Sequence, residues 1–94
     1  MKPRKASDIA SSLERKGFVA SHSHHTYFIL YVKGKKTTIR TKISNGKREC
    51  DQYILAQMAK QVHLSGSEFG SLLDCPLSHE ALVDRLRNKG LISL

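Results

Sequence analysis

The sequence predicts an α+β fold built around a three-stranded antiparallel sheet. Two neighbouring stretches, residues 25–32 and 37–43, are rich in aromatic and β-branched residues, and a tight turn around Gly34 joins them. Segments with helical spacing of apolar residues precede and follow these strands. The expected order is therefore α-β-β-β-α with two short C-terminal helices, arranged as a sandwich with one helix on each side of the sheet. A chain of 94 residues can bury a core of its own, so residues 1–94 are expected to form a single domain.

The first helix is expected over residues 8–16, after a loose basic arm formed by residues 1–6. Ser7 is the expected N-cap, because its hydroxyl can accept a hydrogen bond from a free backbone N–H of the first turn. Asp8 places a negative charge where the helix dipole favours it. Gly17 can adopt the left-handed conformation that often ends a helix.

The sheet is expected to follow this helix directly. Val19 begins a short first strand, and the polar residues 21–24 are expected to form the turn into the second strand. Side chains of the third strand alternate between its two faces. One face carries Thr37, Ile39, Thr41 and Ile43, and the other carries Lys36, Thr38, Arg40 and Lys42.

Three helices are expected after the sheet. Asp51 and Ser78 are N-cap candidates, and Ser65 and Glu68 have the spacing of a capping box. Pro76 interrupts the chain between the last two helices. The expected helical segments are residues 51–63, 65–73 and 78–90.

The composition favours a partner of negative charge. Lys and Arg number 16 against 8 for Asp and Glu, which gives a formal net charge of +8. Such a balance suits a nucleic acid or an acidic protein. Cys50 and Cys75 match no metal-binding or disulfide spacing, so a reducing cytoplasm is the expected location. The sequence has neither an apolar run of membrane-spanning length nor the apolar segment of a secretory signal.

Three histidines, His22, His24 and His25, stand close together just before the aromatic strand. The stretch "LERKGF", then "SHHTYF", then a basic third strand resembles the HicA family of small mRNA-cleaving toxins. In that family a helix ends in Gly-Phe, and a Gly-Ser-His-x-x-aromatic motif opens the second strand. The match runs from Ser23 to Tyr27, although His22 stands where the family usually has glycine. The chain also has "IRTKIS" where many members carry a second histidine.

The resemblance covers residues 7–70, which it implies are a HicA-like core with a fold like that of double-stranded-RNA-binding domains. Residues 71–94 are then a C-terminal helical extension. The resemblance implies a toxin of a type II toxin–antitoxin system that cleaves mRNA, with His24 as the catalytic residue. It also implies an acidic HicB-like antitoxin protein as the partner.

The residue types are consistent with this chemistry without a metal or other cofactor. Histidine can act as acid or base near neutral pH. Lys36, Arg40 and Lys42 can hold phosphates, and Tyr27 or Tyr31 can stack on an unpaired base. Tyr27 and Tyr31 share strand parity with Ile29, so at least one of them is also expected to pack in the core.

Other interpretations stay open at this stage. A non-catalytic RNA-binding module of the double-stranded-RNA-binding type would have the same charge and a similar order of elements. A protein-interaction domain that uses its charge only for an acidic partner is a further alternative. A zinc site that joins His22 and His24 to Cys50 or His63 lacks any recognised ligand spacing.

Overall fold

The computed structural model describes residues 2–74 and 76–93, and Cys75 therefore lies outside the described residues. The fold is mixed α+β, as the sequence predicts, with a three-stranded antiparallel sheet in the order β2-β3-β4. A second sheet of two short strands, β1 and β5, was not predicted. In chain order the elements are β1 (Arg4–Lys5), α1 (Ala6–Arg15), β2 (Phe18–His22), β3 (His25–Val32), β4 (Lys35–Ser44), β5 (Glu49–Cys50), α2 (Gln52–Gln61), α3 (Gly66–Leu73) and α4 (His79–Asn88).

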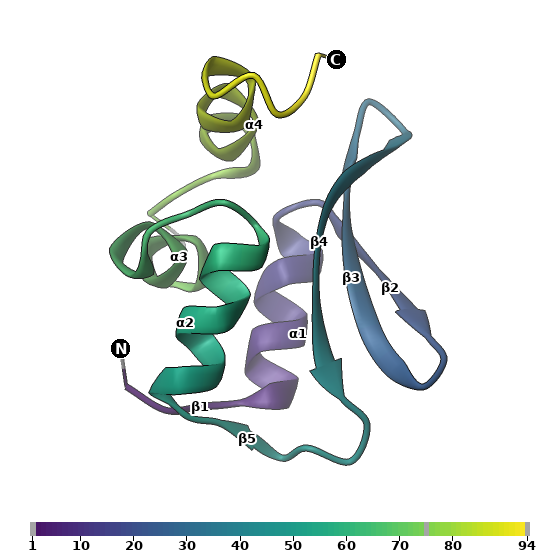
Figure 1. Ribbon diagram of the computed structural model, residues 1–94, viewed down its shortest axis with the longest axis vertical. Helices are drawn as coiled ribbons and strands as arrows, with labels where there is room; N and C mark the ends of the chain where they lie inside the picture. The colour runs from purple at the N-terminus through teal and green to yellow at the C-terminus, as the bar shows by residue number, and fades with distance from the viewer. Residues whose placement is uncertain (1, 75, 94) are drawn as a thin grey trace.

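Helices α1 and α2 lie side by side against the same face of the three-stranded sheet (Figure 1). The expected sandwich with one helix on each side is therefore wrong. The covered face carries apolar side chains such as Phe28 and Leu30 of β3 and Ile39 of β4, all at most 2% exposed. The other face carries Arg40 and Lys42, whose charges would lose hydration under a second helix. One face of the sheet is consequently open.

All four helices of the described chain contribute to one hydrophobic core. Leu13, Leu55, Phe69 and Leu82, one from each helix, are fully buried in it. None of the helices in residues 2–74 and 76–93 is long and apolar enough to cross a membrane.

Two predictions about the beginning of the chain are wrong. Residues 1–6 were expected to be a loose arm, but Arg4 and Lys5 form β1 and pair with Cys50 and Glu49 of β5. Ser7 is not the N-cap, because α1 already begins at Ala6 and no side chain caps it. A backbone hydrogen bond from Ala6 N to Arg48 O, 2.9 Å long, joins the start of this helix to the β5 segment. Tertiary pairing thus sets the start of α1.

The predicted caps of the other helices are confirmed. The Asp51 carboxylate accepts a hydrogen bond from Ile54 N, and the Ser78 hydroxyl accepts one from Ala81 N. Ser65 and Glu68 form the reciprocal bonds of a capping box. These local signals predicted α2, α3 and α4 because each depends only on residues within one helical turn.

Candidate nucleic-acid interface

The open face of the sheet brings together an aromatic ring and two cations. Tyr27 of β3 is the register partner of Lys42 on β4, and Ile29 is the partner of Arg40. The Arg40 guanidinium lies over the Tyr27 ring, 5.6 Å from its centroid, as in a cation–π contact. Arg40 and Lys42 are both exposed, so the prediction of a basic strand face is confirmed. The sequence prediction of core packing for Tyr27 or Tyr31 is wrong, because both are only half-buried and lie on this open face.

His25, the first residue of β3, continues this arrangement toward the start of that strand. Its ring stands edge-on to Tyr27, with 6.2 Å between ring centroids and an interplanar angle of 85°. The Nδ1 atom of His25 is buried and has no hydrogen-bond partner among the described residues. His25, Tyr27 and Arg40 therefore form a continuous line of rings and charge on the open face.

The two expectations for His24 differ, because the family motif opens the second strand whereas the expected turn of residues 21–24 includes His24. The structure agrees with the turn, since β2 runs on to His22 and β3 begins only at His25. Ser23 and His24 form the turn between these strands, and the His24 side chain is exposed. The predicted turn of residues 21–24 is therefore too long, because Ser21 and His22 pair with Tyr27 and Thr26.

Asn45 fixes this turn from the segment that follows β4. Its Nδ2 donates hydrogen bonds to the carbonyl oxygens of Ser23 and His24, at 2.8 and 2.9 Å. Its Oδ1 accepts a hydrogen bond from Thr26 Oγ1 at 3.0 Å. No local sequence pattern indicates Asn45 or Thr26, because their contacts join residues about twenty positions apart.

The bonds of Asn45 and Thr26 determine which ring nitrogen of His22 carries the hydrogen in the neutral imidazole. Since the Thr26 hydroxyl donates its hydrogen to Asn45, its oxygen is free to accept the 3.2 Å contact from His22 Nδ1. Nδ1 of His22 consequently carries a hydrogen. The Nε2 atom of the neutral ring is then the basic nitrogen, and the ring is oriented, as in acid–base sites where a second group fixes the tautomer.

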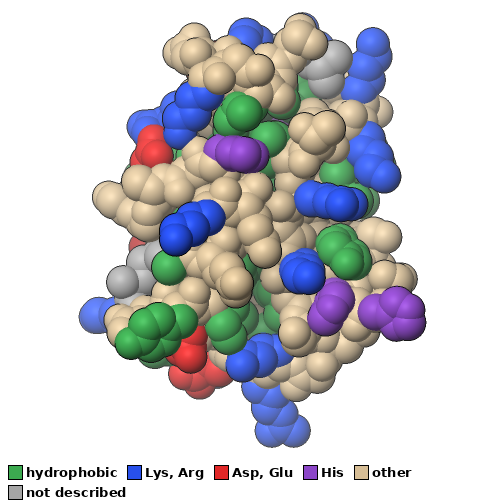
Figure 2. Space-filling view, viewed as in Figure 1, with side chains coloured by type: hydrophobic (Ala, Val, Ile, Leu, Met, Phe, Trp, Pro, Cys, Tyr) green, Lys and Arg blue, Asp and Glu red, His purple; other side chains and the backbone are tan. Residues whose placement is uncertain are grey.

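Charge is segregated along this chain. From Phe18 to Arg48 there are seven Lys and Arg residues and no Asp or Glu. The ion pairs observed among the described residues instead join Arg4 to Asp74, Arg85 and Lys89 to Glu68, and Arg87 to Asp84. Figure 2 shows Lys and Arg side chains on both sides of the molecule, whereas the acidic side chains in that view lie to the left, away from β3 and β4. The absence of acids over this stretch is a sequence signal that strengthens the prediction of a polyanion site.

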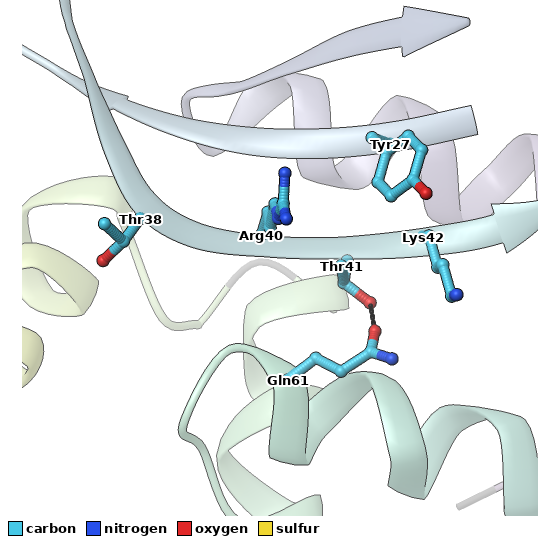
Figure 3. A pocket seen from close by; sticks show the side chains of 6 residues that line it. All are labelled: Tyr27, Thr38, Arg40, Thr41, Lys42 and Gln61. Atoms are coloured by element: carbon cyan, nitrogen blue, oxygen red, sulfur yellow. Dashed lines mark hydrogen bonds between the residues drawn. The ribbon is translucent and has the colours of Figure 1, made fainter. Parts of the chain in front are cut away.

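The predicted site residues are only partly brought together. Tyr27, Arg40 and Lys42 share one cavity of about 370 Å³, with Thr38, Thr41 and Gln61 as its other lining residues (Figure 3). Lys36 is the register partner of Tyr31, toward the β3–β4 hairpin and away from the histidines. Gln61 of α2 was not among the predicted residues, since no sequence pattern links it to β4.

Within the described residues, no group of three or more His, Cys, Asp or Glu side chains is arranged to hold a metal ion. Together these features define an α+β protein with an acid-free, cationic sheet face. His25 lies at one end of this face, His24 lies in the adjoining turn, and His22 lies on the helix side of the sheet. No protein-family model, curated protein or solved structure matches this chain.

Proposed function

We propose that this protein is a metal-independent endoribonuclease that cleaves mRNA, a HicA-like toxin of a type II toxin–antitoxin system in the cytoplasm. The single observation that carries the proposal is that His25 lies at the end of a cationic sheet face and His24 in the turn beside it, with His22 on the helix side of the same turn. The order of α1, β2, β3, β4 and α2, with both helices on one face, supports a fold like that of double-stranded-RNA-binding domains.

The proposed chemistry is transesterification by the RNA itself. The 2′-oxygen attacks the adjacent phosphorus, the 2′-OH proton passes to a basic group, and the P–O5′ bond breaks as its oxygen receives a proton. Imidazoles can serve in both proton transfers, and His24 is the proposed catalytic residue. Arg40 and Lys42 neutralise phosphate charge, and Tyr27 stacks on an unpaired base. The products are a 2′,3′-cyclic phosphate and a 5′-hydroxyl.

An activity assay on the purified chain tests this proposal. A labelled single-stranded RNA is incubated with the wild type in excess EDTA, and the termini of the products are analysed. We expect cleavage with 2′,3′-cyclic ends. Activity that disappears with EDTA and returns with magnesium would contradict the proposed mechanism.

Single substitutions assign the role of each histidine. Loss of a general acid or base typically lowers the rate by about 10²–10⁴-fold. His24→Ala is expected to show such a loss, with circular dichroism confirming the fold. His25→Ala is the essential comparison, because His25 and not His24 shares the open face with Tyr27. A dead His25→Ala together with an active His24→Ala would move the catalytic role by one residue.

An acidic HicB-like antitoxin is the proposed protein partner, because the acid-free face would attract and be covered by negative charge. Co-expression with an affinity tag should recover such a protein in near-stoichiometric amount, and the complex should not cleave RNA. A complex as active as the free chain would contradict masking of the site.

The second candidate is a non-catalytic RNA-binding module. The exposure of His24 in a turn favours it, because no hydrogen bond among the described residues orients this imidazole as a general base. If the wild type binds RNA without cleaving it, and induced expression causes no growth arrest, the RNA-binding module is favoured over the ribonuclease.

A further inference from the structure

A groove with polar and apolar lining residues runs between β4 and α2, beside the open face. It consists of two adjoining cavities of about 370 and 120 Å³, which share Lys42 and Gln61 as lining residues. Figure 3 shows the first cavity, with Arg40 and Lys42 projecting from β4 and Gln61 reaching toward β4 from α2. Its lining residues follow β4 from Thr38 to Ser44, so an extended chain could lie along the strand.

The side chain of Gln61 has a defined orientation. Thr41, which is 2% exposed, donates a hydrogen bond of 2.6 Å from Oγ1 to Gln61 Oε1. The amide oxygen is therefore occupied, and the Nε2 amino group, with its two N–H donors, has no protein acceptor among the described residues. Gln61 thus presents hydrogen-bond donors to the groove.

The charged groups of the groove are likewise hydrogen-bond donors, and the other polar lining residues are hydroxyls and the Gln57 amide. Arg40, Lys42 and Lys47 donate only, and none of the described residues that line the two cavities is acidic. A site in which charged and amide N–H groups converge without an acidic acceptor suits an anion with several acceptor oxygens. The edge of a nucleobase fits less well, since most base edges present both donors and acceptors.

We propose that this groove binds the sugar–phosphate backbone of single-stranded RNA, and that Gln61 Nε2 donates to a phosphate oxygen. The proposal rests on the proposed RNA-cleaving function and extends it, because it places the strand along β4 and α2. Tyr27 adjoins the groove and offers its ring to a base of the same strand. An acidic peptide would satisfy the donors but would not use this ring.

Gln61→Glu is the decisive variant, because it keeps the size of the side chain and replaces donors by a negative charge. Gln52→Glu is its matched control, with the same change on an exposed residue in the first turn of α2, outside the groove. Affinity for a single-stranded RNA oligomer is measured at several salt concentrations, using a catalytically inactive histidine variant as the background. We expect Gln61→Glu to weaken binding by at least about tenfold and Gln52→Glu by less than about threefold.

Two further measurements separate the backbone from the bases and the peptide. An abasic ribose-phosphate oligomer should bind with the same sensitivity to Gln61→Glu, whereas sensitivity only with bases present would overturn the proposal. Poly-glutamate of equal charge should compete more weakly than RNA, and equal competition that depends on Gln61 would favour an acidic peptide. Thr41→Val should also weaken binding, by about threefold, because Gln61 can then turn its oxygen into the groove.

The outcomes distinguish this inference from the proposed function. If the wild type fails to bind RNA at any salt concentration, the RNA function fails and the inference fails with it. If RNA binds well but Gln61→Glu and Gln52→Glu behave alike, the groove proposal is overturned and RNA binding by the open face stands.

Discussion

The imidazole of His79 lies directly over the backbone of Gly17. A Cβ atom on Gly17 would come within 2.3 Å of His79 Nδ1, and that nitrogen donates a 2.8 Å hydrogen bond to the carbonyl oxygen of Lys16. Gly17 also has a φ of +93°, in the region that favours glycine. His79, the first residue of α4, therefore packs against the end of α1, and position 17 has no room for a side chain.

Gly17→Ala should destabilise the protein strongly. The left-handed conformation costs about 1–2 kcal/mol for alanine, and overpacking against His79 adds about 1–3 kcal/mol. Gly46→Ala is the matched control, since Gly46 has a φ of +82° but no atom within 4 Å of the added Cβ. Urea unfolding should show the larger loss of unfolding free energy for Gly17→Ala. Equal losses would mean that the His79 contact contributes nothing in solution.

Lys16→Met should also destabilise the fold. Lys16 is 7% exposed, and its Nζ donates hydrogen bonds to the carbonyl oxygens of Leu72 and Leu77, at 3.0 and 2.5 Å. Methionine fills a similar volume but leaves both carbonyls without this donor, at about 1–3 kcal/mol for each buried group. Lys89→Met is the control, because Lys89 is exposed and bonds the carbonyl oxygen of His63 at the surface. Lys89→Met should lower the free energy of unfolding by less than about 1 kcal/mol. A similar decrease for both variants would contradict the burial of Lys16.

Asn45→Asp should loosen the turn that carries His24. A carboxylate cannot donate to the carbonyl oxygens of Ser23 and His24, and it repels them. Amide hydrogen exchange over residues 23–26 should become faster, and RNA cleavage should fall if His24 acts from this turn. Asn88→Asp, which makes the same change in the last residue of α4, should leave exchange in the turn unchanged. Unaltered exchange in Asn45→Asp would show that the turn is ordered by other contacts.

His22 should populate the tautomer with its hydrogen on Nδ1 when the ring is neutral. The chain of bonds from Asn45 through Thr26 requires it. Nitrogen-15 chemical shifts of the imidazole report the tautomer directly, without any assay of activity. Thr26→Val removes the accepting oxygen and should return His22 toward the mixture found in free imidazole. A wild-type spectrum that shows the hydrogen mainly on Nε2 would contradict this chain of hydrogen bonds.

The free energy of unfolding should fall in acid because two carboxylates have lowered pKa values in the folded state. The hydrogen bond from the Arg4 side chain lowers the pKa of Asp74, and the backbone bond from Ser65, reinforced by Arg85, lowers the pKa of Glu68. A carboxyl with a lowered folded-state pKa adds stability above its unfolded pKa of about 4, and this stability is lost as the pH falls through the folded value. Unfolding free energies measured from about pH 6 to pH 2 should fall less steeply in the Asp74→Asn, Glu68→Gln double variant than in the wild type. Equal slopes would rule out these two groups as the source.

The sequence by itself determined the features that depend on near neighbours along the chain. The caps at Asp51, Ser65 and Ser78 were predictable because each bond closes within one helical turn. The alternation of β4, with Ile39 inside and Arg40 outside, was predictable because strand geometry sends successive side chains to opposite faces. The excess of cations on the sheet follows from the composition of residues 18–48.

Only the tertiary structure decided the features that join distant segments. The pairing of β1 with β5 replaced the expected cap at Ser7, because Cys50 pairs with Arg4 just before α1 and the Arg48 carbonyl accepts a hydrogen bond from Ala6 N at its start. The placement of both helices on one face depended on which side of the sheet was apolar across three strands. The exact end of β2, and with it the position of His24, followed from pairing with Thr26 and Tyr27 and from the reach of Asn45. Gln61 joined the candidate site through Thr41, twenty residues away in the chain. Such contacts have no local pattern, because they are fixed by the packing of whole elements.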